Sequence, residues 1–200
     1  MSNPLEFSRR DLLARLAAGV SLVTAADAQH VHESVAQEKA GQKGAYKPKA
    51  LTAHEYATLQ HLSDLIIPAD DRSPGALAAG AADFIDFLCA SSDEMRDIYT
   101  GGLLWLDDTM AHTSDGQTFL AASPAQQTAL LDRIAYRKNQ SPELNAGIQF
   151  FAFCRRMVAD AYYTTPIGYK EVGYMGNSAM AQFSVPKEAL EYALKRSPFA

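Results

Sequence analysis

Apolar positions recur at helical spacing along most of the chain beyond residue 51, and capping signals mark where helices begin. Thr52 and Glu55 form a capping box, in which each side chain satisfies a free backbone donor at a helix start. Apolar residues at intervals of three and four, typical of one buried helix face, then follow at Tyr56, Leu59, Leu62, Leu65 and Ile66. Pro68 is expected to end this helix.

Four further segments show the same helical pattern. They are expected over residues 75–90, from Ser92 to about His112, from Ser123-Pro124 to about Arg137, and from 141 into the 150s, with one short helix over 187–195. Gly101-Gly102 either kinks the second of these or lets another backbone approach closely. Because no segment alternates with period two over a strand's length, the expected fold is all-α, an irregular bundle of about five or six helices.

Residues 150–177 change character halfway. The first half is apolar on most faces, which predicts a helix buried on most faces. Pro166 then forces Thr165 towards an extended conformation. The glycine-spaced, tyrosine-rich residues after it predict an ordered C-terminal loop. Two interpretations stay open: the loop covers its own core, or it lies on another protein.

This stretch, FFAFCRRMVADAYYTT at 150–165 and PIGYKEVGYMGN at 166–177, resembles the C-terminal signature of the gluconate 2-dehydrogenase subunit 3 family. Residues 65–70 (LIIPAD), 73–76 (SPGA) and 84–86 (FID) resemble it as well, so the likeness covers about 51–182. It implies a small, non-catalytic helical subunit of a secreted flavin-dependent sugar, glucoside or polyol dehydrogenase. FAD is then expected in the catalytic subunit and none in this chain, with electrons passing on to a cytochrome c subunit or a quinone.

The expected interface with that catalytic subunit follows from the same stretch. Its residues are Cys154, Tyr162, Tyr163, Pro166, Gly168, Tyr169, Gly173, Tyr174, Gly176 and Asn177.

Residues 1–28 are typical of an export signal. Ser8-Arg9-Arg10-Asp11-Leu12-Leu13 matches the twin-arginine pattern, with leucine where phenylalanine is usual. The following segment is only moderately apolar, which favours the twin-arginine route, and Ala26-Asp27-Ala28 predicts cleavage before Gln29. An amphipathic cytoplasmic helix with a chance arginine pair, or an uncleaved anchor, is the alternative.

The twin-arginine route carries folded proteins, and a chain without a cofactor gains little from it unless it travels with a partner. We therefore expect a periplasmic escort for a flavoprotein that lacks a signal, membrane-associated only through the complex. Residues 29–50 are polar and glycine-bearing, which predicts a flexible tether before a helical domain over 51–200. His30 and His32 in this tether are expected to be solvated.

Candidate chemistry within the chain is sparse, and no catalytic, cofactor-binding or metal-binding residue is predicted. The net charge of −5 does not favour nucleic acid, and no nucleotide-binding glycine motif or haem motif occurs. Asp70-Asp71 predicts a solvated turn rather than a calcium site. Asp83 and Asp86 are either a general acid–base pair or, more commonly, a wet helix face. His54 and His61 lie two helical turns apart, too far to share one metal ion unaided.

The two cysteines, Cys89 and Cys154, leave three arrangements open. They form an internal disulfide, or Cys154 is exposed beside Arg155 and Arg156 and bridges to the partner, or both are buried free thiols. The alternative function is a stand-alone periplasmic helical enzyme, hydrolase-like and using Asp70, Asp71, Asp83 or Asp86, or a ligand-binding domain. No nucleophile–base–orienter set supports that alternative.

Overall fold

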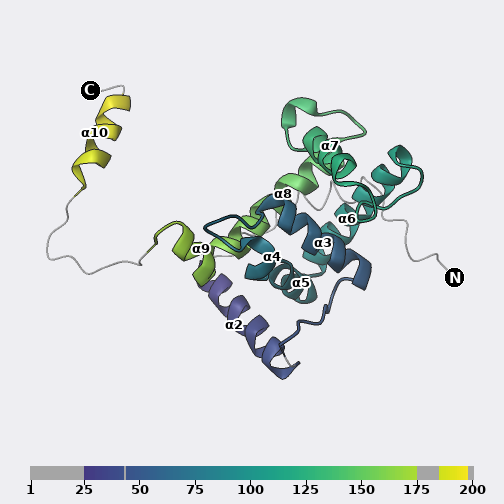
Figure 1. Cartoon of the computed structure of the whole chain (residues 1–200), viewed down its shortest axis with the longest axis horizontal. Helices are drawn as coiled ribbons and strands as arrows, with labels where there is room; N and C mark the ends of the chain where they lie inside the picture. The colour runs from purple at the N-terminus through teal and green to yellow at the C-terminus, as the bar shows by residue number, and fades with distance from the viewer. Residues whose placement is uncertain (1–24, 43, 175–184, 198–200) are drawn as a thin grey trace.

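Every regular element that the computed structural model describes is a helix (Figure 1), which confirms the all-α prediction. The structure describes residues 25–42, 44–174 and 185–197. Its elements are α2 (Ala25–Gly41), α3 (Ala53–Ile66), α4 (Gly75–Ala79), α5 (Ala81–Ser91), α6 (Asp93–Thr113), α7 (Pro124–Ile134), the 3-10 turn η1 (Arg137–Asn139), α8 (Asn145–Tyr163), α9 (Pro166–Glu171) and α10 (Lys187–Arg196). No helix in the described ranges is long and apolar enough to cross a membrane.

Helix α8 is the centre of the bundle, in contact with α3, α4, α5, α6, α7 and α9. Its apolar side chains are buried on most sides, as the sequence predicted: Ile148, Phe150, Phe151, Phe153, Met157, Val158 and Ala161. Tyr99 of α6 meets Phe150 edge-on, with ring centroids 5.9 Å apart. Burial of this many large apolar groups stabilises the bundle around α8.

Two predicted helix starts are confirmed by capping boxes, whereas the last long helix, predicted from residue 141, begins at Asn145. Thr52 and Glu55 form the capping box of α3, and Ser123 forms one with Gln126 at the start of α7, where Pro124 occupies the first turn. The Ser92 hydroxyl accepts a hydrogen bond from the Met95 N–H at the start of α6.

Two glycines shape the middle of the bundle. The single helix predicted over 75–90 is wrong, because Gly80 adopts a left-handed φ of 76° and separates α4 from α5. Helix α6 passes through Gly101 and Gly102 as one helix. A Cβ on Gly102 would lie 2.0 Å from the Phe150 ring, so this glycine admits a ring of α8 rather than a kink.

The stretch predicted as an extended tether is largely a docked helix, which corrects the expectation that folded structure begins at Thr52. Helix α2 covers 25–41 and packs against α5 (Figure 1). Its Ala28, Val31 and Val35 are buried in the main core. These three apolar residues form one narrow stripe among polar ones, so the local pattern carries only a weak helical signal.

The expected C-terminal loop is also partly helical. Thr165 is extended, with φ −97° and ψ 160° as predicted, and its hydroxyl accepts from the Gly168 N–H to cap α9. The loop prediction is therefore wrong for 166–171, which form α9. Gly176 and Asn177, like Arg9 and Arg10 of the predicted signal, lie outside the described residues.

Candidate partner-binding surface

A buried tyrosine joins the two separate stretches that resemble the family signature. The Tyr162 hydroxyl, at the end of α8, hydrogen-bonds with Ser73 Oγ and donates to Glu171 Oε2 of α9. Burial, and then the neighbouring Glu171 carboxylate, raise the pKa of Tyr162. The 70–73 turn is itself ordered, because Asp70 Oδ1 accepts from the N–H groups of Arg72 and Ser73 at 2.8 and 2.7 Å. This confirms the predicted turn and fixes its position against α8.

Two glycines allow these stretches to approach one another. A Cβ on Gly168 would lie 2.3 Å from the Tyr162 carbonyl oxygen, so only glycine lets α9 fold back against the end of α8. Gly75 has a φ of 76°, and a Cβ there would lie 2.6 Å from the Ala69 backbone nitrogen. The spacing of glycines in the signature therefore reflects backbone packing beneath the surface.

Large apolar side chains are exposed at the end of α8 and in the residues that directly follow α9. Tyr163 is 40% exposed, Val172 59% and Tyr174 52%. Tyr169 is half-buried, and its ring centroid lies 5.5 Å from that of Tyr174. Together with the exposed Pro166, these residues form what we call the α9 surface: Tyr163, Pro166, Tyr169, Val172 and Tyr174. Rigid, partly polar aromatic groups of this kind are enriched where proteins bind one another. Gly173 is also exposed, at a φ of 65°.

Three of the residues predicted for the interface are buried instead. Tyr162 and Cys154 have no exposed surface, and Gly168 is buried beneath the end of α8. Desolvation raises the pKa of the Cys154 thiol to about 12, and burial likewise raises that of Cys89. The prediction of an exposed, reactive Cys154 is therefore wrong, and the alternative of two buried free thiols is confirmed.

Asp86 fastens the N-terminal segment to α5. Its fully buried carboxylate accepts hydrogen bonds from the Tyr46 hydroxyl at 2.9 Å and from the backbone N–H groups of Lys49 at 2.7 Å, Ala50 at 3.2 Å and Leu51 at 2.9 Å. Burial and the nearby Asp86 carboxylate raise the pKa of Tyr46. The interpretation of this position as a wet helix face is wrong.

Asp83, one turn earlier, is buried as well and joins α5 to both α3 and α2. It accepts a hydrogen bond from the Tyr56 hydroxyl and pairs with Lys39 Nζ of α2 at 2.5 Å. We call residues 25–52, held by these two carboxylates, the N-terminal arm. Local sequence pattern could not reveal these contacts, because the partners lie between 27 and 44 positions away along the chain.

His32 connects the N-terminal arm to the edge of the α9 surface. Its Nε2 lies 2.8 Å from Thr164 Oγ1, next to Tyr163, and its ring centroid lies 4.7 Å from that of Phe84. Desolvation lowers the pKa of His32. The prediction of a solvated His32 is therefore wrong, whereas His30 is exposed as expected.

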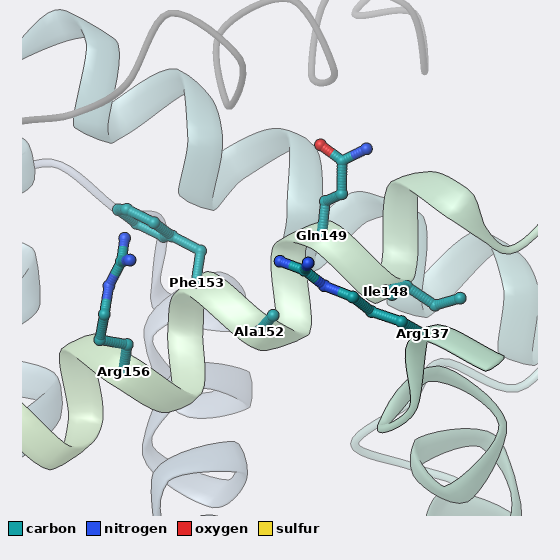
Figure 2. A pocket seen from close by; sticks show the side chains of 6 residues that line it. All are labelled: Arg137, Ile148, Gln149, Ala152, Phe153 and Arg156. Carbon is teal, nitrogen blue, oxygen red and sulfur yellow. The ribbon is translucent and has the colours of Figure 1, made fainter. Parts of the chain in front are cut away.

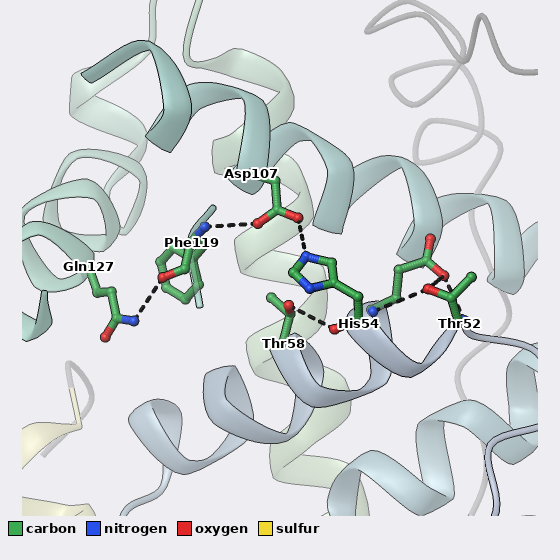
Figure 3. A network of polar contacts seen from close by, with 7 residues as sticks. Thr52, His54, Thr58, Asp107, Phe119 and Gln127 are labelled. Carbon is green, nitrogen blue, oxygen red and sulfur yellow. Dashed lines mark hydrogen bonds and ion pairs between the residues drawn. The ribbon is translucent and has the colours of Figure 1, made fainter. Parts of the chain in front are cut away.

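His54 and His61 belong to structural hydrogen bonds, and Figure 3 shows those around His54. His54 Nε2 lies 2.6 Å from Asp107 Oδ2, and Asp107 Oδ1 accepts from the Phe119 N–H at 2.8 Å. His61 Nε2 lies 2.9 Å from the Gln127 amide oxygen, and the Gln127 amide donates to the Phe119 carbonyl. These contacts tie α3 to α6 and α7. The described part of the chain holds no group of three or more His, Cys, Asp or Glu placed to bind a metal ion.

The comparisons with known proteins agree with the resemblance in the sequence. Residues 53–180 match the family described as Gluconate 2-dehydrogenase subunit 3. The match covers more than half of the chain, which therefore belongs to this family of dehydrogenase-complex subunits. No curated protein and no solved structure matches the chain.

Three residues of this region carry contacts that sequence reasoning did not assign. Ser73 and Glu171 lie inside the signature stretches, but nothing in their local pattern indicates that both reach Tyr162. Thr164 was grouped with the end of a helix, and its partner His32 lies 132 positions away. The pairing of Ser73 and Tyr162 across 89 positions is a tertiary contact of the same kind.

Proposed function

We propose that this chain is the non-catalytic small subunit of a periplasmic, FAD-dependent sugar, glucoside or polyol dehydrogenase. It escorts the catalytic subunit through twin-arginine export and stabilises it afterwards. The observation that carries the proposal is the α9 surface, an exposed aromatic patch built on a buried framework of family-signature residues. An exposed apolar patch of this kind marks an interaction site, and membership in a family of subunits supplies the class of partner.

The export step rests on the sequence of residues 8–13 and on the absence of any cofactor motif in the chain. Under this proposal FAD is bound by the catalytic subunit, which lacks its own signal. Electrons leave that flavin for a cytochrome c subunit or a quinone. Cleavage before Gln29 would remove the first turn of α2 and keep Val31 and Val35, which hold the rest of the helix to α5.

The described contacts weigh against the stand-alone enzyme. Asp83 and Asp86 are buried and fasten the N-terminal arm, and Asp70 orders its own turn. Each of these carboxylates is therefore engaged in hydrogen bonds or ion pairs within the chain, whereas a general acid or base must be able to reach a substrate.

Co-expression with the flavin-dependent subunit tests the proposal. The wild-type chain is expected to co-purify as a yellow complex and to be colourless and inactive when expressed alone. Tyr174→Ala and Tyr169→Ala are expected to weaken the complex about tenfold or more, because exposed tyrosines at an interface commonly dominate its affinity. Leu104→Ala provides the control, since Leu104 of α6 is 45% exposed and lies outside the α9 surface. Equal weakening by Leu104→Ala and Tyr174→Ala would remove the α9 surface from the interface.

A further inference from the structure

A groove lined by two arginines runs along the outer face of α8 (Figure 2). Two adjoining hollows of about 210 and 250 Å³ share Arg137, Ile148 and Gln149. The first continues to Ala152, Phe153 and Arg156, and the second to Gln140 and Asn145. Arg137 comes from η1 and extends alongside α8, whereas Arg156 rises beside Phe153 from the helix itself.

The groove offers hydrogen-bond donors above an apolar floor. Ile148 and Phe153 are almost fully buried and form the floor. The Arg156 guanidinium lies over the Phe153 ring, 5.4 Å from its centroid, which holds its planar group in the groove. Such a site suits a carboxylate, because guanidinium groups bind carboxylates through paired hydrogen bonds.

Neither arginine is neutralised by its own chain within the described ranges, where the ion pairs formed by lysine and arginine involve Lys39, Lys49, Arg96 and Lys187. Burial raises the pKa of Asp160, one turn beyond Arg156, and the Arg156 charge opposes that rise, but the two form no ion pair among the described contacts. This is notable in a chain with 23 acidic and 18 basic residues, where carboxylates outnumber cations. Two exposed guanidinium groups around one groove therefore leave their binding capacity for another molecule.

The groove shares one face of α8 with Tyr163 of the α9 surface. Gln149, Ala152, Arg156 and Tyr163 succeed one another at intervals of three, four and seven, so they lie on one face of α8. The fourteen residue steps from Gln149 to Tyr163 span about 21 Å, at 1.5 Å per step. A protein that covers Tyr163 and continues along this helix face reaches both arginines.

We propose that the groove binds an acidic segment of the catalytic subunit, with aspartate or glutamate side chains placed between Arg137 and Arg156. This extends the proposed function and rests on it. A free small carboxylate would fill only part of the groove, because the two hollows adjoin one another along the helix. An extended segment occupies such a shape. Paired charges there also orient the partner before the tyrosines engage.

The test compares charge reversals at neighbouring exposed positions in the purified two-subunit complex. Arg156→Glu and Arg137→Glu are expected to raise the dissociation constant at least tenfold, and to flatten its dependence on salt concentration. Arg155→Glu makes the same change at an exposed residue that does not line the groove, and is expected to alter the constant less than threefold. Thermal unfolding of the isolated variants checks that all three remain folded.

The possible outcomes are distinct. Equal effects of Arg155→Glu and Arg156→Glu would overturn the groove proposal and leave the proposed function standing. Calorimetric binding of sodium gluconate to the isolated chain, abolished by Arg156→Glu, would overturn the acidic segment as occupant. Failure of the wild-type chain to bind the flavin subunit would refute the proposed function itself, and this proposal with it.

Discussion

Replacing Asp86 by alanine tests whether the N-terminal arm is part of the fold. The Asp86 carboxylate receives four hydrogen bonds, three from consecutive backbone N–H groups at 49–51 and one from Tyr46. Its removal leaves these donors without their acceptor, around a carboxylate that is fully buried. Backbone donors buried without a partner are costly.

The magnitude follows from these contacts. A hydrogen bond to a charged group contributes about 1.5–3 kcal/mol, and four bonds that share one acceptor do not add in full, so we take the loss as equal to about two of them. We expect Asp86→Ala to lower the free energy of unfolding by about 3–5 kcal/mol. At about 2–4 °C per kcal/mol for a chain of this size, the melting temperature falls by roughly 6–20 °C.

Guanidinium unfolding followed by circular dichroism measures this loss, and hydrogen exchange locates it. Exchange is expected to rise first at residues 25–52, while amides of α6 and α8 stay protected until the bundle opens. Asp108→Ala is the matched control, because Asp108 is exposed on α6. A loss below 1 kcal/mol for Asp86→Ala, similar to that of Asp108→Ala, would refute the assignment of Asp86 as the fastening of the arm.

Three further predictions concern buried groups. With a pKa raised to about 12, Cys154 carries a thiolate fraction of only about 10⁻⁴ at pH 8. Ellman's reagent is therefore expected to modify the folded chain slowly, and to modify both thiols rapidly after unfolding. Rapid reaction of one equivalent in the folded chain would contradict this burial. The pKa of His32 is lowered in the folded chain, so the imidazole binds a proton more tightly in the unfolded chain. The contribution of His32 to the free energy of unfolding is therefore complete above about pH 6.5 and declines as the pH falls below that value. Urea unfolding at pH 5.0 and 7.5 measures the decline, and His32→Asn is expected to reduce it; an unchanged pH dependence would exclude His32. Gly102→Ala places a Cβ against the Phe150 ring and is expected to lower the free energy of unfolding by about 1–3 kcal/mol. Gly41→Ala is the control, because its Cβ meets open space, and it is expected to change the free energy of unfolding by less than 1 kcal/mol. Similar changes for the two variants would show that the packing at Gly102 yields easily.

Sequence predicted the parts of the fold that depend on neighbours along the chain. The capping residues Thr52 and Ser123 were predicted correctly, since a capping box joins residues three positions apart. The extended Thr165 follows from the adjacent proline in the same way.

The errors arose where a residue's role depends on distant partners. In the sequence, Asp86 looks like any polar residue of a helix, and only the contacts with residues 46–51 show that it is buried. Likewise, the narrow apolar stripe of α2 indicates a docked helix only once its contact with α5 is known. Of the candidate interface, the exposed tyrosines 163 and 174 were predicted correctly as surface residues, whereas Tyr162 next to them points inward to Ser73. Local pattern does not decide which of two adjacent tyrosines is buried.

The escort role is tested most directly by locating the dehydrogenase activity in cells that produce both subunits, with either the wild-type chain or Arg9→Lys, Arg10→Lys. We expect the wild-type chain to place the activity in the periplasmic fraction and the lysine variant to leave it in the cytoplasm, still as an assembled complex. Equal periplasmic activity with both chains, or with the small chain absent, would show that the flavin subunit reaches the periplasm by another route.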